Sequence, residues 1–231
     1  MSVRTTAALF ALPAFLAVLS PSPEPATRIE LHGFEVQLVN DFAHHELHDA
    51  VFAELGDQLF RITRVVAEPA LAKLRAIPIR VGFEDRRHAR HCMFYHPSKQ
   101  WLADHEYPTE LAGGVEIANA RNFLSWTLDQ PWMVLHELAH GYHHQVLGYG
   151  HAGIRAAYGA AKQAGTYDEV LRIGGRKEKH YALENDQEYF AEATEAYFGT
   201  NDFYPFVRAE LAAHDERGYH LLEQIWGPRR R

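Results

Sequence analysis

The spacing of hydrophobic and polar positions predicts strands in the first half of the chain and helices in the second half. Between Phe34 and Val39 apolar and polar residues alternate, which is typical of a strand with one buried face. From about His45 to Val66 apolar residues recur at intervals of three and four, which indicates an amphipathic helix. Further strands are expected over Ile77–Phe83, Cys92–His96 and Gly113–Asn119. In the last of these, Val115 and Ile117 alternate with Glu116, so we expect an edge strand with a polar outer face.

After this strand the pattern is mostly helical to the end of the chain. Helices are predicted over Pro131–Leu147, His151–Gln163, Asn185–Gly199, Pro205–His214 and Glu216–Trp226. Asn185 or Asp186 is a typical residue to start a helix, and Gly199 is typical of a helix end. A hairpin is expected around Val170–Gly175. Strands followed by helices predict an α+β fold with a small mixed sheet in the N-terminal half and a mostly helical C-terminal half.

The segment His136-Glu137-Leu138-Ala139-His140 is an HExxH motif inside one of the predicted helices. Because each helical residue turns about 100°, the two histidines stand one turn apart on one face and can chelate a single ion. Glu137 lies about 60° from His140 around the helix, so its carboxylate can reach a water on that ion without taking a coordination position. This pattern predicts a metal-assisted hydrolase with Glu137 as the general base.

The third metal ligand is less evident from the residues. A catalytic zinc ion takes three protein ligands and keeps one position open. The ligand spacings of metzincins, of aminopeptidases and of thermolysin are all absent downstream of His140. Glu188 and Glu192 lie one turn apart on a predicted helix, which suits a metal ligand and a carboxylate that orients a ligand imidazole. Asn185 and Glu188 also match a capping box, which needs no metal. The residues alone leave both interpretations of Glu188 open.

A family resemblance bears on this choice. HELAH is followed by Tyr181 and then by the segment Glu188-Tyr189-Phe190-Ala191-Glu192. With these motifs the chain resembles the gluzincin zinc metallopeptidases typified by the catalytic domain of anthrax lethal factor. In that family a tyrosine precedes the ligand glutamate by seven residues, and Tyr181 stands in that position relative to Glu188. The resemblance covers His136–Phe198 and is carried by the joint spacing of short motifs.

The resemblance implies a zincin-like peptidase domain whose sheet packs on the HExxH helix. It implies one zinc ion per chain, held by His136, His140 and Glu188. It also implies that Glu192 orients a ligand imidazole and that Tyr181 donates to the oxyanion formed when water adds to a peptide carbonyl. Such a donor acts as charge develops, so it stabilises the transition state more than the substrate.

Composition limits the chemistry further. The chain has 16 histidines, a single cysteine (Cys92) and a formal net charge of −7. One cysteine excludes an intrachain disulfide and a cysteine-rich zinc site, so a metal has to be held by imidazole and carboxylate. The acidic balance argues against a nucleic-acid partner. The expected partner is a peptide or protein substrate.

Residues 1–26 have the pattern of a signal peptide. Arg4 precedes an apolar run from Ala7 to Leu19, and a Ser/Pro-rich stretch, Ser20–Ala26, follows. The apolar run is shorter than the about 20 residues that a membrane helix needs. We therefore expect a single zincin-like metallopeptidase domain over 27–231, secreted or periplasmic, with no membrane span after cleavage.

Some alternatives concern other residues and the function as a whole. The chain could be a non-catalytic, zinc-stabilised exported binding protein, although a structural site has no use for the carboxylate of Glu137. His91, Cys92 and His96 suggest a second metal site, but no further ligand follows at a suitable spacing. His143 shares the helix face of the HExxH histidines and could support a ligand or contact substrate, but the favoured expectation is that it is exposed.

Overall fold

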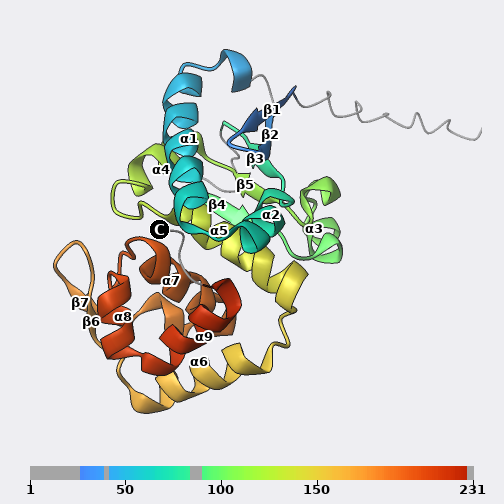
Figure 1. Ribbon diagram of the computed structural model, residues 1–231. Helices are drawn as coiled ribbons and strands as arrows, with labels where there is room; N and C mark the ends of the chain where they lie inside the picture. The colour runs from blue at the N-terminus through green and yellow to red at the C-terminus, as the bar shows by residue number, and fades with distance from the viewer. Residues whose placement is uncertain (1–26, 39–41, 84–89, 228–231) are drawn as a thin grey trace, which may run out of the picture.

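The computed structural model describes residues 27–38, 42–83 and 90–227, and it is a mixed α and β structure (Figure 1). The α-helices of this part of the chain are α1 (His48–Val65), α2 (Glu68–Arg75), α3 (Lys99–Asp104), α4 (Ala120–Trp126), α5 (Met133–Tyr142), α6 (Ala152–Ala164), α7 (Asp186–Phe198), α8 (Arg208–His214) and α9 (Glu216–Trp226). In Figure 1 the sheet and α1 lie above α5, and helices α6 to α9 lie below it. The predicted α+β class, with its helical C-terminal half, is confirmed.

The main sheet has five strands in the order β1-β2-β3-β5-β4. The strands are β1 (Thr27–Leu31), β2 (Phe34–Leu38), β3 (Ile79–Val81), β4 (Met93–Tyr95) and β5 (Val115–Ile117). β2, β3 and β5 run parallel to one another, and β1 and β4 are antiparallel to their neighbours. The small mixed sheet predicted for the N-terminal half is therefore confirmed.

The prediction that the strand over Gly113–Asn119 forms an edge is wrong. β5 lies between β3 and β4, so β4 is the edge strand on that side. Glu116 was expected to face solvent, but it is 8% exposed and lies 2.9 Å from Nε2 of His96. The alternation around Glu116 therefore reflects a polar pair buried in the sheet.

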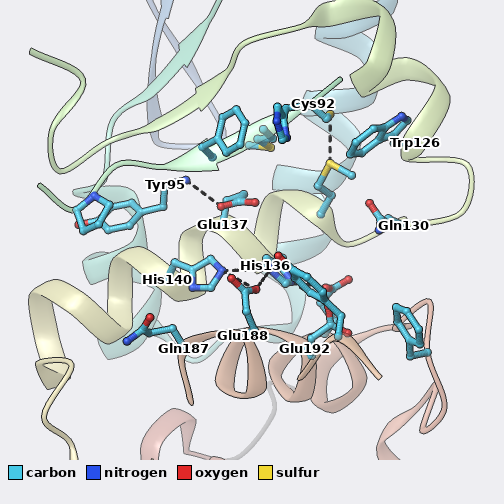
Figure 2. A pocket seen from close by; sticks show the side chains of 18 of the residues that line it. Cys92, Tyr95, Trp126, Gln130, His136, Glu137, His140, Gln187, Glu188 and Glu192 are labelled. Carbon is cyan, nitrogen blue, oxygen red and sulfur yellow. Dashed lines mark hydrogen bonds and ion pairs between the residues drawn. The ribbon is translucent and has the colours of Figure 1, made fainter. Parts of the chain in front are cut away.

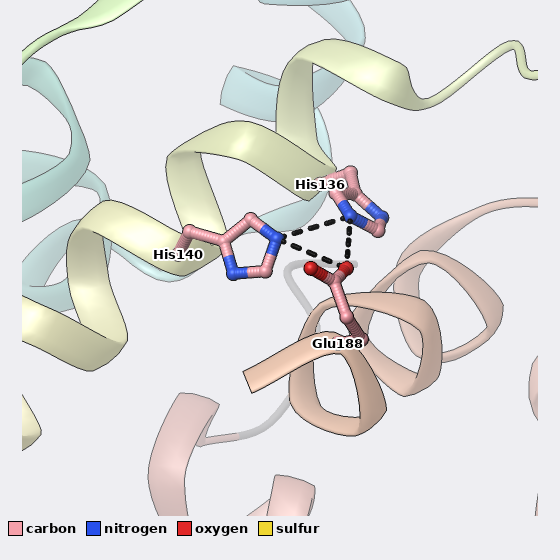
Figure 3. A group of neighbouring side chains, drawn as sticks. All are labelled: His136, His140 and Glu188. Atoms are coloured by element: carbon pink, nitrogen blue, oxygen red, sulfur yellow. Dashed lines mark hydrogen bonds and ion pairs between the residues drawn. The ribbon is translucent and has the colours of Figure 1, made fainter. Parts of the chain in front are cut away.

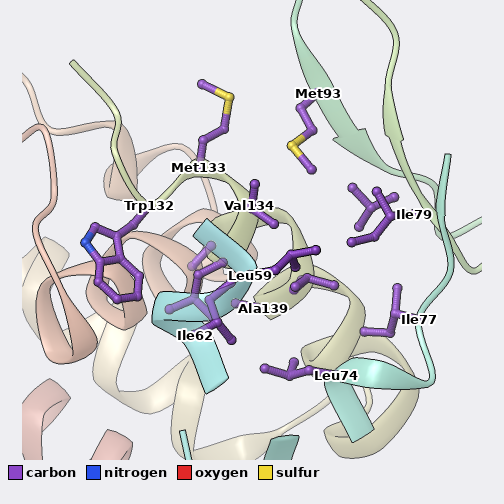
Figure 4. Packing of buried hydrophobic residues seen from close by; sticks show 14 of the residues in the cluster. Leu59, Ile62, Leu74, Ile77, Ile79, Met93, Trp132, Met133, Val134 and Ala139 are labelled. Carbon is purple, nitrogen blue, oxygen red and sulfur yellow. The ribbon is translucent and has the colours of Figure 1, made fainter. Parts of the chain in front are cut away.

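Helix α5 is the central element of the core. Every residue of the helix is buried except Glu137. Its upper face packs on side chains from α1, α2 and the sheet, and Figure 4 shows this cluster. Members of the cluster are Leu59, Ile62, Leu74, Ile77, Ile79, Met93, Val134 and Ala139. Its lower face meets α7, so α5 is enclosed between the sheet and α7.

Most of the other predicted elements are present with shifted ends. The helix predicted over Pro131–Leu147 is α5 followed by a π-helical turn, His143–Leu147. The expected hairpin is formed by β6 (Val170–Leu171) and β7 (Lys177–Glu178). β1, α2, α3 and α4 were not predicted, because β1 is a largely exposed edge strand and the three helices have only eight, six and seven residues.

The predicted signal peptide, residues 1–26, lies outside the described residues. Among the residues that the structure describes, no helix combines the length and the apolar character needed to cross a membrane.

Candidate metal centre

The local sequence explains how α5 holds the HExxH side chains. The N-cap residue, Trp132, provides no side-chain acceptor for the first backbone N–H groups of the helix. Instead, Oε1 of the buried Gln58, on α1, accepts the backbone N–H of Val134 at 3.1 Å. This hydrogen bond satisfies one of the unpaired donors at a helix start. It also ties α5 to α1.

His136, His140 and Glu188 bring three donor atoms together (Figure 3). The two Nε2 atoms lie 3.1 Å apart, and Oε2 of Glu188 lies 3.2 Å from His136 Nε2 and 3.3 Å from His140 Nε2. Ligands bonded to one zinc ion at about 2.0–2.1 Å in tetrahedral geometry are separated by about 3.3–3.4 Å. The three atoms are therefore spaced as ligands of one tetrahedral ion would be.

Hydrogen bonds alone do not account for this triangle. A ring nitrogen carries at most one hydrogen, and that hydrogen points at one neighbour. If both imidazoles donate to Glu188, their Nε2 atoms face each other at 3.1 Å with no bond between them. A divalent ion at the centre would satisfy all three atoms at once. The residues present thus fit a metal.

A proton and a metal ion compete for this site. Burial lowers the pKa of His136, but the hydrogen bonds to Glu188 and Glu195 raise it further, so the pKa ends well above its usual value. Burial would raise the pKa of Glu188, but the two imidazoles lower it overall. In the absence of an ion, a proton is thus retained on His136. Metal binding has to release that proton.

The two interpretations of Glu188 are compatible in the structure. The side chain of Asn185 is the N-cap of α7 and accepts the backbone N–H groups of Gln187 and Glu188. The carboxylate of Glu188 is turned toward the two histidines. The cap fixes the start of the helix, and the first turn then presents Glu188 to α5.

The other ring nitrogen of His136 faces a different carboxylate from the one predicted. Nδ1 of His136 lies 2.7 Å from Oε1 of Glu195 but 3.8 Å from Oε1 of Glu192. Glu192 also lies 3.7 Å from Nδ1 of His180. Burial raises the pKa of both glutamates, and the charge of Glu195 raises that of Glu192 further.

Although His136, Glu192 and Glu195 also form a compact donor group, its geometry does not suit an ion. The separation of 2.7 Å between His136 and Glu195 is too short for two ligands of one zinc ion and is typical of a charge-assisted N–H···O hydrogen bond.

Glu137 and Tyr181 line the same cleft as the donor triangle. The cleft has a volume of about 530 Å³, and β4 and α5 form one side of it (Figure 2). Oε2 of Glu137 accepts the backbone N–H of Tyr95 at 2.8 Å. Burial raises the pKa of Glu137, while the nearby imidazoles lower it. Tyr181 is 47% exposed, and burial raises the pKa of its phenol, so the phenol stays protonated at neutral pH.

The remaining histidine predictions have different outcomes. The expectation that His143 is exposed is wrong, because its side chain is fully buried between the rings of Tyr149 and Phe190. His96 is paired with Glu116, and Sγ of Cys92 lies 3.4 Å from the sulfur of Met133. In the described part of the chain these residues form no metal-binding group.

Glu195 and Tyr149 are residues of the cleft that sequence reasoning did not assign to the site. A carboxylate seven residues after Glu188 lies on the same face of α7, so the helical period offered a signal for Glu195. No local signal was available for Tyr149, which follows the π-helical turn.

Comparisons with known proteins identify no family. No family model, no curated protein and no solved structure matches the chain.

Proposed function

We propose that this protein is a zinc-dependent peptidase that hydrolyses peptide bonds with a metal-activated water and a glutamate base. The observation that carries the proposal is the triangle of His136 Nε2, His140 Nε2 and Glu188 Oε2, with sides of 3.1–3.3 Å. The ligand set of two imidazoles and one carboxylate is that of catalytic zinc sites, which keep one coordination position open. We further propose a zincin-like arrangement, in which the sheet covers the HExxH helix and α7 supplies the third ligand.

Each residue of the site has a role in this scheme. Bound zinc would lower the pKa of a water and polarise the substrate carbonyl. Glu137 takes the proton from the attacking water and passes it to the leaving amine. The backbone N–H of Tyr95 holds one oxygen of Glu137, which fixes the carboxylate in the cleft. Tyr181 donates to the oxyanion, and Glu195 fixes the ring of His136.

The edge strand β4 offers a binding surface for the peptide backbone. Cys92 and His96 bond to the chain around β5 through their backbone groups, whereas the N–H of Tyr95 points away from β5 to Glu137. Since backbone groups alternate along an antiparallel strand, the N–H and C=O of Met93 also point to the open edge. An extended peptide can pair there by strand addition. β4, and not the segment Gly113–Asn119 for which the sequence predicted an edge strand, thus offers this edge to a peptide.

The test combines metal analysis with cleavage of peptides. The purified protein, residues 27–231, should contain one zinc per chain when its metal content is measured by inductively coupled plasma mass spectrometry. This protein should cleave members of a proteome-derived peptide library, lose activity in a chelator and regain it on addition of zinc. Glu137→Gln should abolish cleavage while zinc stays bound. Glu184→Gln, in which an exposed carboxylate is changed just before α7, is the matched control.

The result also separates the enzyme from a non-catalytic zinc protein. Stoichiometric zinc without any cleavage by the wild type would support a zinc-stabilised binding protein. A fully active Glu137→Gln variant would overturn the mechanism. A protein without bound metal would remove the basis of both functions.

A further inference from the structure

The cleft has two distinct ends along β4. Figure 2 shows Tyr95, His140 and Gln187 at one end and Trp126, Gln130 and Glu192 at the other. Tyr181 lines this cleft as well. At the Tyr95 end the cleft is lined by a second phenol, Tyr149, whose ring contacts the imidazole of His144 that also meets Tyr95.

The ring of Tyr149 is fixed by the π-helical turn that precedes it. The ring lies 5.1 Å from that of His143, edge to face, and 4.9 Å from that of His144. Nδ1 of His144 lies 2.8 Å from the hydroxyl of Tyr95, so the same imidazole contacts both the edge strand and Tyr149. Gly148, which follows the π-helical turn, has a φ of +76°, a conformation that favours glycine. Tyr149 is thereby held beside the Tyr95 end of β4.

The hydroxyl of Tyr149 is a neutral donor. Burial raises the pKa of this phenol, and the nearby Tyr95, Glu188 and Glu137 raise it further, so the hydroxyl keeps its proton at neutral pH. Residues 27–38, 42–83 and 90–227 provide no hydrogen-bond partner for it, and its neighbours His143 and His144 meet it through ring contacts. A half-buried donor of this kind is available to an acceptor on a ligand.

We propose that the Tyr149 hydroxyl donates a hydrogen bond to a main-chain carbonyl of the peptide, at a residue that passes the His140 side of the metal centre. The inference rests on the proposed peptidase function and deepens it. A peptide paired with Met93 on β4 extends toward Tyr95, and Tyr149 lies at that end of the cleft. Tyr149 therefore binds a carbonyl next to the reacting one, and productive substrates extend past His140.

The test is Tyr149→Phe, which keeps the ring and removes only the hydroxyl. With the best peptide from the library, KM should rise about 3- to 10-fold, the effect of losing one neutral hydrogen bond, while kcat stays within about twofold. Zinc content should equal that of the wild type. Tyr158→Phe is the matched control, because that hydroxyl bonds to the backbone of Leu183 outside the cleft.

A series of peptides shortened from either end adds an independent readout. Removing the residues that pass Tyr149 should abolish the difference between the wild type and Tyr149→Phe. An unchanged KM, or a loss confined to kcat, would overturn the inference. If the wild type binds zinc but cleaves no peptide, the proposed function itself fails, and the inference falls with it.

Discussion

Glu188 and Glu195 project from one face of α7, and each lies close to a different ring nitrogen of His136. Oε2 of Glu188 lies 3.2 Å from Nε2 of His136, and Oε1 of Glu195 lies 2.7 Å from Nδ1. Seven residues correspond to almost two helical turns, so both carboxylates project from the same side of the helix. His136 thus donates its Nδ1–H to Glu195, which leaves Nε2 free to bind a metal.

This relationship predicts that Glu195→Gln weakens zinc binding. A neutral amide holds the Nδ1–H less strongly and makes the imidazole a poorer ligand, so the affinity for zinc should fall about 10- to 100-fold. Competition with a chromophoric chelator measures the change. Glu192→Gln is the control, because Glu192 lies 3.8 Å from the ring and its loss should matter less. Equal effects of the two substitutions would contradict the assignment of Glu195.

The sequence predicted the residues that meet at the site better than it predicted how they are supported. The i, i+4 spacing of His136 and His140 follows from helical geometry, so their shared face could be predicted. Glu188 required the family resemblance, because its capping position explained it equally well. The choice between Glu192 and Glu195 depends on how α7 is rotated against α5, which no local pattern encodes.

The order of the strands could not be predicted from the sequence either. Alternation indicates that Val115–Ile117 is a strand, but its insertion between β3 and β4 is set by long-range pairing. Glu116 resembles a solvent-facing residue until His96, twenty residues earlier in the chain, is found beside it. Which residues pair over such a distance in sequence depends on the tertiary structure, and a local pattern does not show it.

Tyr181→Phe should lower turnover and leave zinc binding intact. Tyr181 lines the cleft with a neutral phenol and lies outside the candidate donor group, so under the proposed function its loss removes only a hydrogen bond to the developing charge. Loss of one oxyanion donor costs about 10²- to 10³-fold in kcat. Steady-state kinetics with the library peptide check this, and an unchanged kcat would remove Tyr181 from the catalytic residues.

Gly199→Ala should strongly destabilise the protein. Gly199 ends α7 where the indole of Trp132 packs against its backbone, and a Cβ there would lie 1.9 Å from that ring. Overpacking of this kind costs about 1–3 kcal/mol or more in the free energy of unfolding, because a buried indole cannot move aside freely. Urea denaturation measures the loss. The control is Gly159→Ala in α6, where the new Cβ meets no atom within 4 Å, and there stability should rise by about 0.5–1 kcal/mol.

The buried imidazole of His143 should make stability depend on pH. Burial lowers the pKa of His143 to about 4, and neither ring nitrogen has a hydrogen-bond partner among the described residues. The unfolded chain, with an ordinary histidine pKa of about 6.5, binds the proton first as the pH falls. His143 therefore leaves stability unaffected above pH 6.5 and reduces it between pH 6.5 and pH 4, by about 2 kcal/mol at pH 5.

His143→Phe removes this titration and keeps an aromatic ring between Tyr149 and Phe190. At pH 7 the variant should be at least as stable as the wild type, because two unpaired buried nitrogens are lost. Between pH 7 and pH 5 it should lose about 2 kcal/mol less in the free energy of unfolding. Urea denaturation in a chelator measures both proteins without a contribution from metal release. His44→Phe, at an exposed imidazole in the turn before α1, is the control and should follow the wild type. Parallel pH dependences of His143→Phe and the wild type would show that His143 is not the group responsible.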